Sequence, residues 1–462
     1  MRRRNRAAEI LDFLAGRKHW DYTFLPGRKV RETIEAVVAD FQERALPALT
    51  PRETSLPGLP GKADAVIGMR RSGKSFFLFQ QIQQLLARRV PRRRMLYVNL
   101  EDERLLPLKA QELGLIPESL YRRFPEVRSE TCWFFLDEVQ NVPGWERFVR
   151  RLLDTENVRV VVTGSSAKLL GREIATSLRG RSLATELLPF SFREGMRHAG
   201  VAVPDRWPPP AQARSRLERA MLDHIDVGGF PEVQSLSPDL RVRVLQDYVH
   251  VVVLRDVIDR HQVANPGAVR ALVRQLLGAP AAPFTVHKAF NDLKSQGFRL
   301  GKDTVYEYFR YLEDAFLIFP VEVDSQSVRA RMTHPRKCYL IDPGLARAFS
   351  YRAAGDVGRL LENVVYLELR RRGYQVNYAV TSLGREIDFV ARRRGLPDQL
   401  IQVCADLGDP KTRERELGAL SEGLRERSGA RGTVVSLHDE ETLKVGRRTV
   451  RIVPAWRWLL TS

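Results

Sequence analysis

Apolar and polar residues follow a repeating order from residue 63 onward. Short runs of consecutive apolar residues alternate with longer stretches in which apolar residues recur at helical spacing. Strands that are apolar along their whole length are buried on both faces, so the pattern predicts a parallel sheet covered by helices on both sides. The predicted strands are 63–67, 95–100, 131–136, 158–163 and 182–188. The predicted helices are 74–88, 105–124 with a break at Gly114 and Pro117, 144–153 and 167–177.

Four further regions surround this predicted core at 61–190. Residues 1–60 read as a helical arm and a linker rich in proline and glycine. Residues 191–262 predict a helical lid, and residues 263–335 run helix, helix, helix and strand, which is the order of a winged helix. Residues 336–462 return to mixed α/β character, so the predicted fold class is α/β throughout.

A glycine-rich loop follows the first predicted strand and opens the first helix. Residues 68–75 read GMRRSGKS and fit the pattern G-x-x-x-x-G-K-[ST] in full. Gly68 and Gly73 let the backbone curl so that its N–H groups point at phosphate oxygens, and the helix N-terminus adds positive charge. Lys74 can then reach the β- and γ-phosphates of ATP, and Ser75 can ligate Mg²⁺. The predicted nucleotide-binding residues of this segment are Gly68, Arg71, Ser72, Gly73, Lys74, Ser75 and Phe76.

Two acidic residues follow the third predicted strand, 131–136. Asp137 lies at the carboxyl end of the strand, which is the sheet edge that carries the phosphate loop. We expect Asp137 to hold Mg²⁺ together with Ser75, and Glu138 to polarise the attacking water.

The fourth predicted strand ends in a segment rich in hydroxyl groups. A polar side chain there would lie beside the γ-phosphate and the attacking water, and Ser165 is the predicted residue, with Thr163 and Ser166 as alternatives. The same hydroxyls could instead cap the helix that is predicted to begin near residue 167. Together with the loop and the acids, this segment predicts a P-loop ATPase.

The charge balance is strongly basic, because 75 lysines and arginines stand against 56 acidic residues, which gives a net charge of +19. This surplus favours an anionic partner, with DNA as the first candidate; a coding bias would explain arginine over lysine but not the excess over acids. The three scattered cysteines predict neither a disulfide framework nor a metal knuckle. No apolar run is long enough to span a bilayer, so we expect a cytoplasmic protein without a membrane partner.

Several motifs together resemble AAA-type ATPases, and more closely a bacterial and archaeal family in which this module precedes a domain similar to restriction endonucleases. The matching stretches include 68–75 (GMRRSGKS), 134–140 (FFLDEVQ), 161–170 (VVTGSSAKLL), 228–233 (GGFPEV) and 385–390 (REIDFV). With others they cover nearly the whole chain after residue 50. The resemblance implies ATP and Mg²⁺ as cofactors and a homo-oligomer, for which a ring such as a hexamer is expected.

Two motifs gain a role from this resemblance. AAA-type proteins place an arginine finger, aimed at a neighbouring subunit's γ-phosphate, at the end of the helix before the fifth strand. Arg179 and Arg181 occupy this place, and Arg181 is preferred over the alternative of a plain surface arginine. The segment 228–231 resembles the turn with which related signalling ATPases contact adenine, here through Pro231; a simple turn between helices is the alternative.

The C-terminal region is expected to adopt a restriction-endonuclease-like fold. Such sites hold a metal with acids on adjacent elements and use a lysine to orient the water. Glu362 and Asp388 are the candidate acids, although plain surface charge and strand-end polarity are the favoured alternative for both. Gln402 stands where these nucleases have an acid or glutamine. Where they have lysine, this chain has Cys404. We therefore predict that the fold persists while cleavage is lost.

The winged-helix region is a second candidate for DNA contact, although such modules also serve for packing alone. The residues predicted to reach a groove or phosphates are Lys302, Thr304, Tyr308 and Arg310, whereas Tyr306 and Phe309 fit a core face. Three functions follow: an oligomeric ATPase that binds or remodels DNA, a nucleotide-gated switch that acts on a protein partner, and an ATP-regulated nuclease. We expect the first, and Cys404 disfavours the third.

Overall fold

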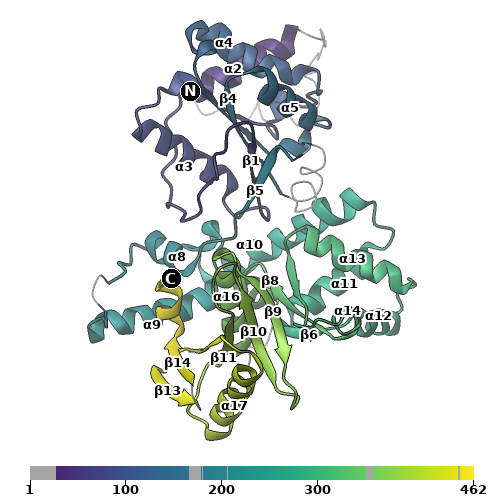
Figure 1. The fold of residues 1–462 in the computed structure, drawn as a ribbon. Coiled ribbons are helices and arrows are strands. Elements are labelled where there is room, and N and C mark those ends of the chain that lie inside the picture. The colour runs from purple at the N-terminus through teal and green to yellow at the C-terminus, as the bar shows by residue number, and fades with distance from the viewer. Residues whose placement is uncertain are drawn as a thin grey trace, which may run out of the picture.

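A five-stranded parallel sheet forms the upper part of the molecule in Figure 1. The computed structural model describes residues 28–165, 178, 180–204, 207–349, 357–445 and 448–461. The strand order is β2-β3-β4-β1-β5, and every neighbouring pair is parallel. The strands are β1 (Ala63–Ile67), β2 (Met95–Asn99), β3 (Cys132–Asp137), β4 (Val158–Gly164) and β5 (Ser182–Glu186). The predicted α/β class and parallel sheet are therefore confirmed.

Alternate residues of these strands pack into two different cores, as the period of two in a strand requires. Phe134 lies in a core shared with α4 (Leu115–Arg123) and α5 (Trp145–Thr155). Its neighbour Phe135 lies in a second core, which α3 (Lys74–Ala87) covers. Helix α2 (Arg28–Glu43) contributes to both cores. Both faces of the central strands β1, β3 and β4 are thus largely buried, which explains their apolar runs, whereas the edge strand β5 is only partly buried.

The helix that was predicted over 105–124, with a break at Gly114 and Pro117, forms only after Gly114. Short 3-10 turns occupy Glu103–Leu105 and Glu112–Gly114, and α4 begins at Leu115. Pro107 lies between the two turns and has no backbone N–H to donate to a helix, which is the physical reason for the difference.

The lid region is helical and ends in a π-helical segment. It contains α8 (Phe192–His198), α9 (Ala211–Val227) and α10 (Pro238–Val251). A π-helix over Val252–Asp259 continues α10 directly. Because π-helical turns are rare and concentrate at functional sites, this segment is of interest beside the nucleotide loop.

A small antiparallel sheet with three helices follows the lid. The helices are α11 (Pro266–Leu277), α12 (Val286–Ser295) and α13 (Lys302–Asp314). The sheet has the order β6-β8-β7, with β6 (Ala282–Phe284), β7 (Ile318–Val321) and β8 (Arg336–Leu340). The expected boundary at residue 335 therefore cuts through this sheet, because its central strand comes from the next region.

One predicted DNA-contacting residue of α13 points inward. Tyr308 is 3% exposed and packs in the core beside Phe309, whereas Tyr306 is 48% exposed. The prediction that Tyr308 reaches DNA is therefore wrong, because helical spacing from Val305 and Leu312 places Tyr308 on the buried face. The expectation that Tyr306 fits a core face is wrong for the same reason. Lys302 and Arg310 are exposed, as a DNA contact would require.

A six-stranded mixed sheet forms the C-terminal region and packs back against the lid. Its order is β13-β14-β12-β11-β10-β9, and its strands are β9 (Gln375–Val380), β10 (Glu386–Arg392), β11 (Gln399–Val403), β12 (Arg431–Ser436), β13 (Glu441–Val445) and β14 (Arg448–Pro454). Three helices precede this sheet in the chain: α14 (Val328–Thr333), α15 (Pro343–Phe349) and α16 (Val357–Arg371). Two more, α17 (Pro410–Glu426) and α18 (Ala455–Leu460), follow its first strands. The C-terminal helix α18 contacts α8 and α9, as Figure 1 shows. Strand β13 was not predicted, because it is a largely exposed edge without an apolar run.

Across the part of the chain that the structure describes, no helix combines the length and the apolar character needed to cross a bilayer.

Candidate nucleotide-binding site

Two glycines shape the loop between β1 and α3 as the motif requires. Gly68 has φ 155°, and a Cβ placed there would lie 2.3 Å from the carbonyl oxygen of Leu187. Gly73 has φ 97° and precedes α3 in the left-handed region, which a side chain rarely adopts. The loop therefore turns tightly against the chain that follows β5, and larger residues at these positions would force it open.

The side chain of Lys74 lies inside the loop and not in solvent. It is 4% exposed, and Nζ donates to the carbonyl oxygens of Gly68 (3.2 Å) and Met69 (3.3 Å). Nζ also lies 3.5 Å from Oε1 of Glu138. A buried ammonium is costly unless oxygen atoms surround it, so these three oxygens hold the charge in place. The amine is thus positioned at the centre of an anion-binding loop.

The acid pair after β3 is placed beside this loop. Asp137 is 1% exposed; Tyr97 donates to its Oδ2 (2.8 Å), and Thr163 bonds to its Oδ1. Burial, and then repulsion from Glu138, raises the pKa of Asp137, while hydrogen bonds from Ser75, Thr163 and Tyr97 oppose this rise. Ser75 and Asp137, the predicted magnesium ligands, therefore lie in hydrogen-bond contact. Tyr97 was missed, because nothing in an apolar strand marks its single hydroxyl as functional.

Glu138 sits in an unusual backbone conformation at the end of the strand. Its φ is 51°, a left-handed value that is uncommon for residues other than glycine and asparagine. Burial works against its charge, but Lys74 together with Gln140 and Arg70 outweighs that effect, so its pKa is lowered overall. The carboxylate therefore stays ionised at neutral pH beside the buried amine, as a group that accepts a proton or orients water must be.

Among the residues that the structure describes, Ser165, the hydroxyl predicted at the end of β4, has no hydrogen bond to Asp137 or Glu138, whereas Thr163 contacts both. Ser165 is fully buried, and its Oγ bonds to Oδ1 of Asp256 (3.4 Å) in the π-helix. Thr163, the alternative, contacts Asp137 and accepts the backbone N–H of Glu138 (2.9 Å). Ser166, the third candidate, lies outside the described residues. Thr163 is thus the hydroxyl beside the acid pair, and Ser165 faces the lid.

Asp256 also ties the phosphate loop to the lid. Arg70 donates from Nε to Oδ2 of Asp256 (2.9 Å), and Asp256 is 2% exposed. Arg260, one helical turn on, approaches the same carboxylate at 3.8 Å. These residues were not predicted as site residues, because their contact joins positions 186 residues apart in the sequence.

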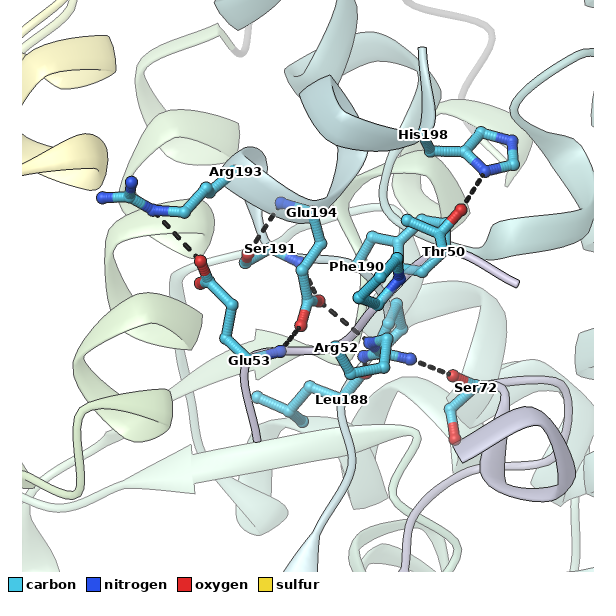
Figure 2. A network of polar contacts seen from close by, with 12 residues as sticks. Thr50, Arg52, Glu53, Ser72, Leu188, Phe190, Ser191, Arg193, Glu194 and His198 are labelled. Carbon is cyan, nitrogen blue, oxygen red and sulfur yellow. Dashed lines mark hydrogen bonds and ion pairs between the residues drawn. The ribbon is translucent and has the colours of Figure 1, made fainter. Parts of the chain in front are cut away.

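A residue of the N-terminal linker completes the loop's support, as Figure 2 shows. Arg52 is 8% exposed, and Nη1 donates to the carbonyl oxygen of Ser72 (2.9 Å). Its Nε donates to Oε2 of Glu194 (3.0 Å) in α8, and Nη2 bonds to the carbonyl of Leu188. One guanidinium therefore joins the phosphate loop, the chain after β5 and the lid. The linker packs into the site and does not simply lead to it.

The glycine-proline turn lies against the same loop. Pro231 Cγ is 3.7 Å from the position that a Cβ on Gly73 would take. Asp342 holds this turn from the C-terminal side, because its carboxylate accepts the N–H groups of Gly229 (2.5 Å) and Gly344 (2.8 Å). A Cβ on Gly228 would lie 1.9 Å from this carboxylate, so the first position of the turn must be glycine. Burial raises the pKa of Asp342 to about 7.

Other predicted loop residues lie at the rim of the site. Arg71 is exposed, with φ 67°, and its Nη1 lies 3.4 Å from Oε2 of Glu232. Phe76 is 52% exposed on the first turn of α3 and lies edge-on to Phe79. Both side chains therefore border the loop without taking part in the buried contacts.

Arg181 lies at the opposite edge of the sheet from the phosphate loop. Strands β1 and β5 are parallel, with Ala63 opposite Ser182, so Arg181 precedes the amino end of β5. A five-residue strand spans about 16 Å, which is longer than an arginine side chain. Its guanidinium is 46% exposed and pairs with Asp154. Arg181 therefore cannot reach its own chain's loop. The other candidate, Arg179, lies outside the described residues.

The residues present fit a nucleoside triphosphate with a divalent cation. The loop offers a buried ammonium at its centre, and Ser72 Oγ is fully buried with no hydrogen-bond partner among the described residues. Ser75 and Asp137 supply the hydroxyl and carboxylate oxygens that Mg²⁺ prefers. An orphaned buried hydroxyl is costly, and a phosphate oxygen or a water would satisfy it.

Comparison with known proteins agrees with this geometry. The AAA domain family matches residues 61–196, and a domain of unknown function, DUF8612, matches residues 218–354. An uncharacterized protein of Methanocaldococcus jannaschii is 33% identical over 438 residues, which is 92% of this chain and 95% of that protein. An uncharacterized protein of Haemophilus influenzae is 29% identical over 340 residues, which is 73% of this chain and 80% of that one. Among solved structures, a Walker-type ATPase of Pyrococcus abyssi has a TM-score of 0.39 and 13% identity, over 70% of this chain and 95% of its own.

The parallel sheet, the loop after β1 and the acid pair after β3 define an AAA-type P-loop ATPase. The match to the Methanocaldococcus jannaschii protein covers 92% of this chain and so extends well beyond the ATPase core. The chain belongs to the family of that protein, an archaeal and bacterial family of AAA-type ATPases.

Proposed function

We propose that the protein binds ATP with Mg²⁺ and hydrolyses it, in an oligomer that binds or remodels DNA. The observation that carries the ATPase part is the buried contact between Lys74 and Glu138, at 3.5 Å within the glycine-framed loop. An ammonium and a carboxylate held this close have the two charges that a phosphate-transfer site needs: one for the phosphates, one for the water.

The roles of the individual residues follow from their placement. Lys74 neutralises the terminal phosphates, and Ser75 and Asp137 would hold Mg²⁺, which supplies further charge neutralisation when bound. Glu138, kept ionised by Lys74, orients the water for attack. Thr163 holds both acids in place, because its hydroxyl bonds to the carboxylate of Asp137 and accepts the backbone N–H of Glu138. Pro231, against the loop, is proposed to contact the adenine.

The oligomeric part of the proposal rests on Arg181. This side chain is exposed on the far edge of the sheet and cannot serve its own site. We assign it as an arginine finger for the neighbouring subunit, where a charged fork matches phosphate oxygens. Its pairing with Asp154 would then break when subunits assemble.

The DNA part of the proposal rests on charge. The net charge of +19 attracts anionic partners such as DNA. Lys302 and Arg310 are exposed on α13, where they can contact phosphates. The second candidate, a switch that acts on a protein, is favoured by the contacts that link the loop to the lid through Asp256 and the proline turn to the C-terminal region through Asp342.

Turnover with and without DNA tests this proposal and separates its parts. We expect duplex DNA to raise ATP turnover at low salt. The affinity of the protein for DNA should fall steeply as the salt concentration rises, because phosphate contacts release counterions. The double change Lys302→Ala with Arg310→Ala should weaken binding, while the exposed Arg88→Ala, on a different element, should not. If DNA changes neither turnover nor assembly, the remodelling function fails and the protein-directed switch takes its place.

A further inference from the structure

A buried lysine lies at the centre of the carboxylates of the C-terminal region. Lys337, on β8, is 3% exposed. Its Nζ lies 2.9 Å from Oε1 of Glu362, 2.6 Å from Oε1 of Glu386 and 2.9 Å from Oδ1 of Asp388. These acids come from α16 and β10, so three segments of the chain converge on one ammonium.

Further hydrogen bonds hold Glu362 and Asp388 in this cluster. Tyr339 donates to Oε1 of Glu362 (2.7 Å), and the N–H of Val403 donates to Oδ2 of Asp388 (2.9 Å). Gln402 accepts the N–H of Asp388 (2.8 Å) and donates to the carboxylate of Glu416. Both oxygens of Asp388 and one oxygen each of Glu362 and Glu386 are thus engaged with donors of the chain.

This arrangement does not fit a divalent cation. Metal–oxygen bonds to Mg²⁺ or Ca²⁺ are about 2.0–2.6 Å long, whereas the present distances are those of charge-assisted hydrogen bonds to an ammonium. A cation entering between the acids would meet the positive charge of Lys337. Among the described residues, no group of His, Cys, Asp and Glu side chains is arranged to hold a metal ion.

We propose that the Lys337 ammonium takes the place of a metal ion in this region. Cys404 stands where the resembling nucleases have a catalytic lysine beside a metal. Here a lysine from a different strand, Lys337, lies between the carboxylates, where the metal ion would bind. The ammonium then balances part of the carboxylate charge, and its ion pairs fix α16 and β10 to β8. The cluster then has a structural role, and metal-dependent cleavage is blocked.

The test is a Mn²⁺ titration of the full chain without nucleotide, followed by electron paramagnetic resonance. Wild-type protein should show no Mn²⁺ site that depends on Asp388. Lys337→Met removes the charge at similar size, and should create a site of about one Mn²⁺ per chain that adding Asp388→Asn abolishes. Lys337→Arg keeps the charge and should bind none.

Thermal unfolding gives a second measurement with a matched control. Lys337→Met should melt several degrees below wild type and recover part of the loss with Mn²⁺, because three carboxylates lose their counterion. The exposed Lys444→Met, on β13, should melt as wild type does in both conditions.

Three outcomes would overturn the proposal. They are an Asp388-dependent Mn²⁺ site in the wild-type protein, Mn²⁺-dependent nicking of plasmid that Asp388→Asn abolishes, and a folded Lys337→Met variant that takes up no Mn²⁺. If Lys337→Met fails to fold, the comparison of wild type with Asp388→Asn still decides the first two. None of these measurements involves ATP, so they stand apart from the ATPase proposal.

Discussion

Replacing Glu138 with glutamine should lower ATP turnover about 100-fold or more, the range for loss of a positioned general base. The amide keeps the shape of the side chain but cannot accept a proton or hold the negative charge that faces the water. Lys74 keeps its bonds to the carbonyl oxygens of Gly68 and Met69, so the loop should still bind ATP. Turnover by phosphate release, and affinity by equilibrium binding of a fluorescent ATP analogue, separate the two effects.

The control for this change is Glu103→Gln, an exposed acid after β2 at the same sheet edge. It should leave both turnover and affinity unchanged. Turnover within a few-fold of wild type in Glu138→Gln would remove Glu138 from the mechanism. Loss of binding along with turnover would show that Glu138 supports the loop and not the water.

Arg52→Ala should destabilise the protein by about 3–5 kcal/mol in the free energy of unfolding, since it leaves a buried carboxylate without its partner. The guanidinium bonds to Glu194 and to the carbonyl of Ser72, so its loss also removes one of the contacts that tie the phosphate loop to the lid. We therefore expect weaker ATP binding in the folded variant. Denaturant unfolding, and nucleotide affinity measured well below the midpoint, report the two losses.

Two further variants test this second prediction. Arg52→Lys keeps the charge but not the fork, and should recover part of the stability while ATP stays weakly bound. The exposed Arg88→Ala, at the end of α3, should resemble wild type. A stable Arg52→Ala variant with unchanged affinity would show that the linker only lies over the site and does not support it.

The ATPase core could be predicted because its signals are local. Strand β1 has the predicted bounds, and β3 and β4 lie within one residue of theirs. Gly68, Gly73 and Lys74 belong to one short motif, and its glycines mark the positions where the backbone must turn tightly. Asp137 ends an apolar strand. Such features depend on neighbours in sequence, which a reader of the sequence can see.

The contacts that could not be predicted all join distant segments. Arg52 meets Glu194 across 142 residues, and Arg70 meets Asp256 across 186. Lys337 bonds to Asp388, which is 51 residues away. Lys337 lies on β8, directly after the expected domain boundary at residue 335. A long arginine or lysine in a basic chain gives no sign of being buried until tertiary packing is known.

The direct test of the central claim is equilibrium binding of Mg·ATP to the purified, folded protein by calorimetry, beside Lys74→Ala. The account predicts saturable, Mg²⁺-dependent binding of one nucleotide per chain that Lys74→Ala abolishes or weakens severely. Absence of binding to wild-type protein, or equal binding to Lys74→Ala, would contradict it.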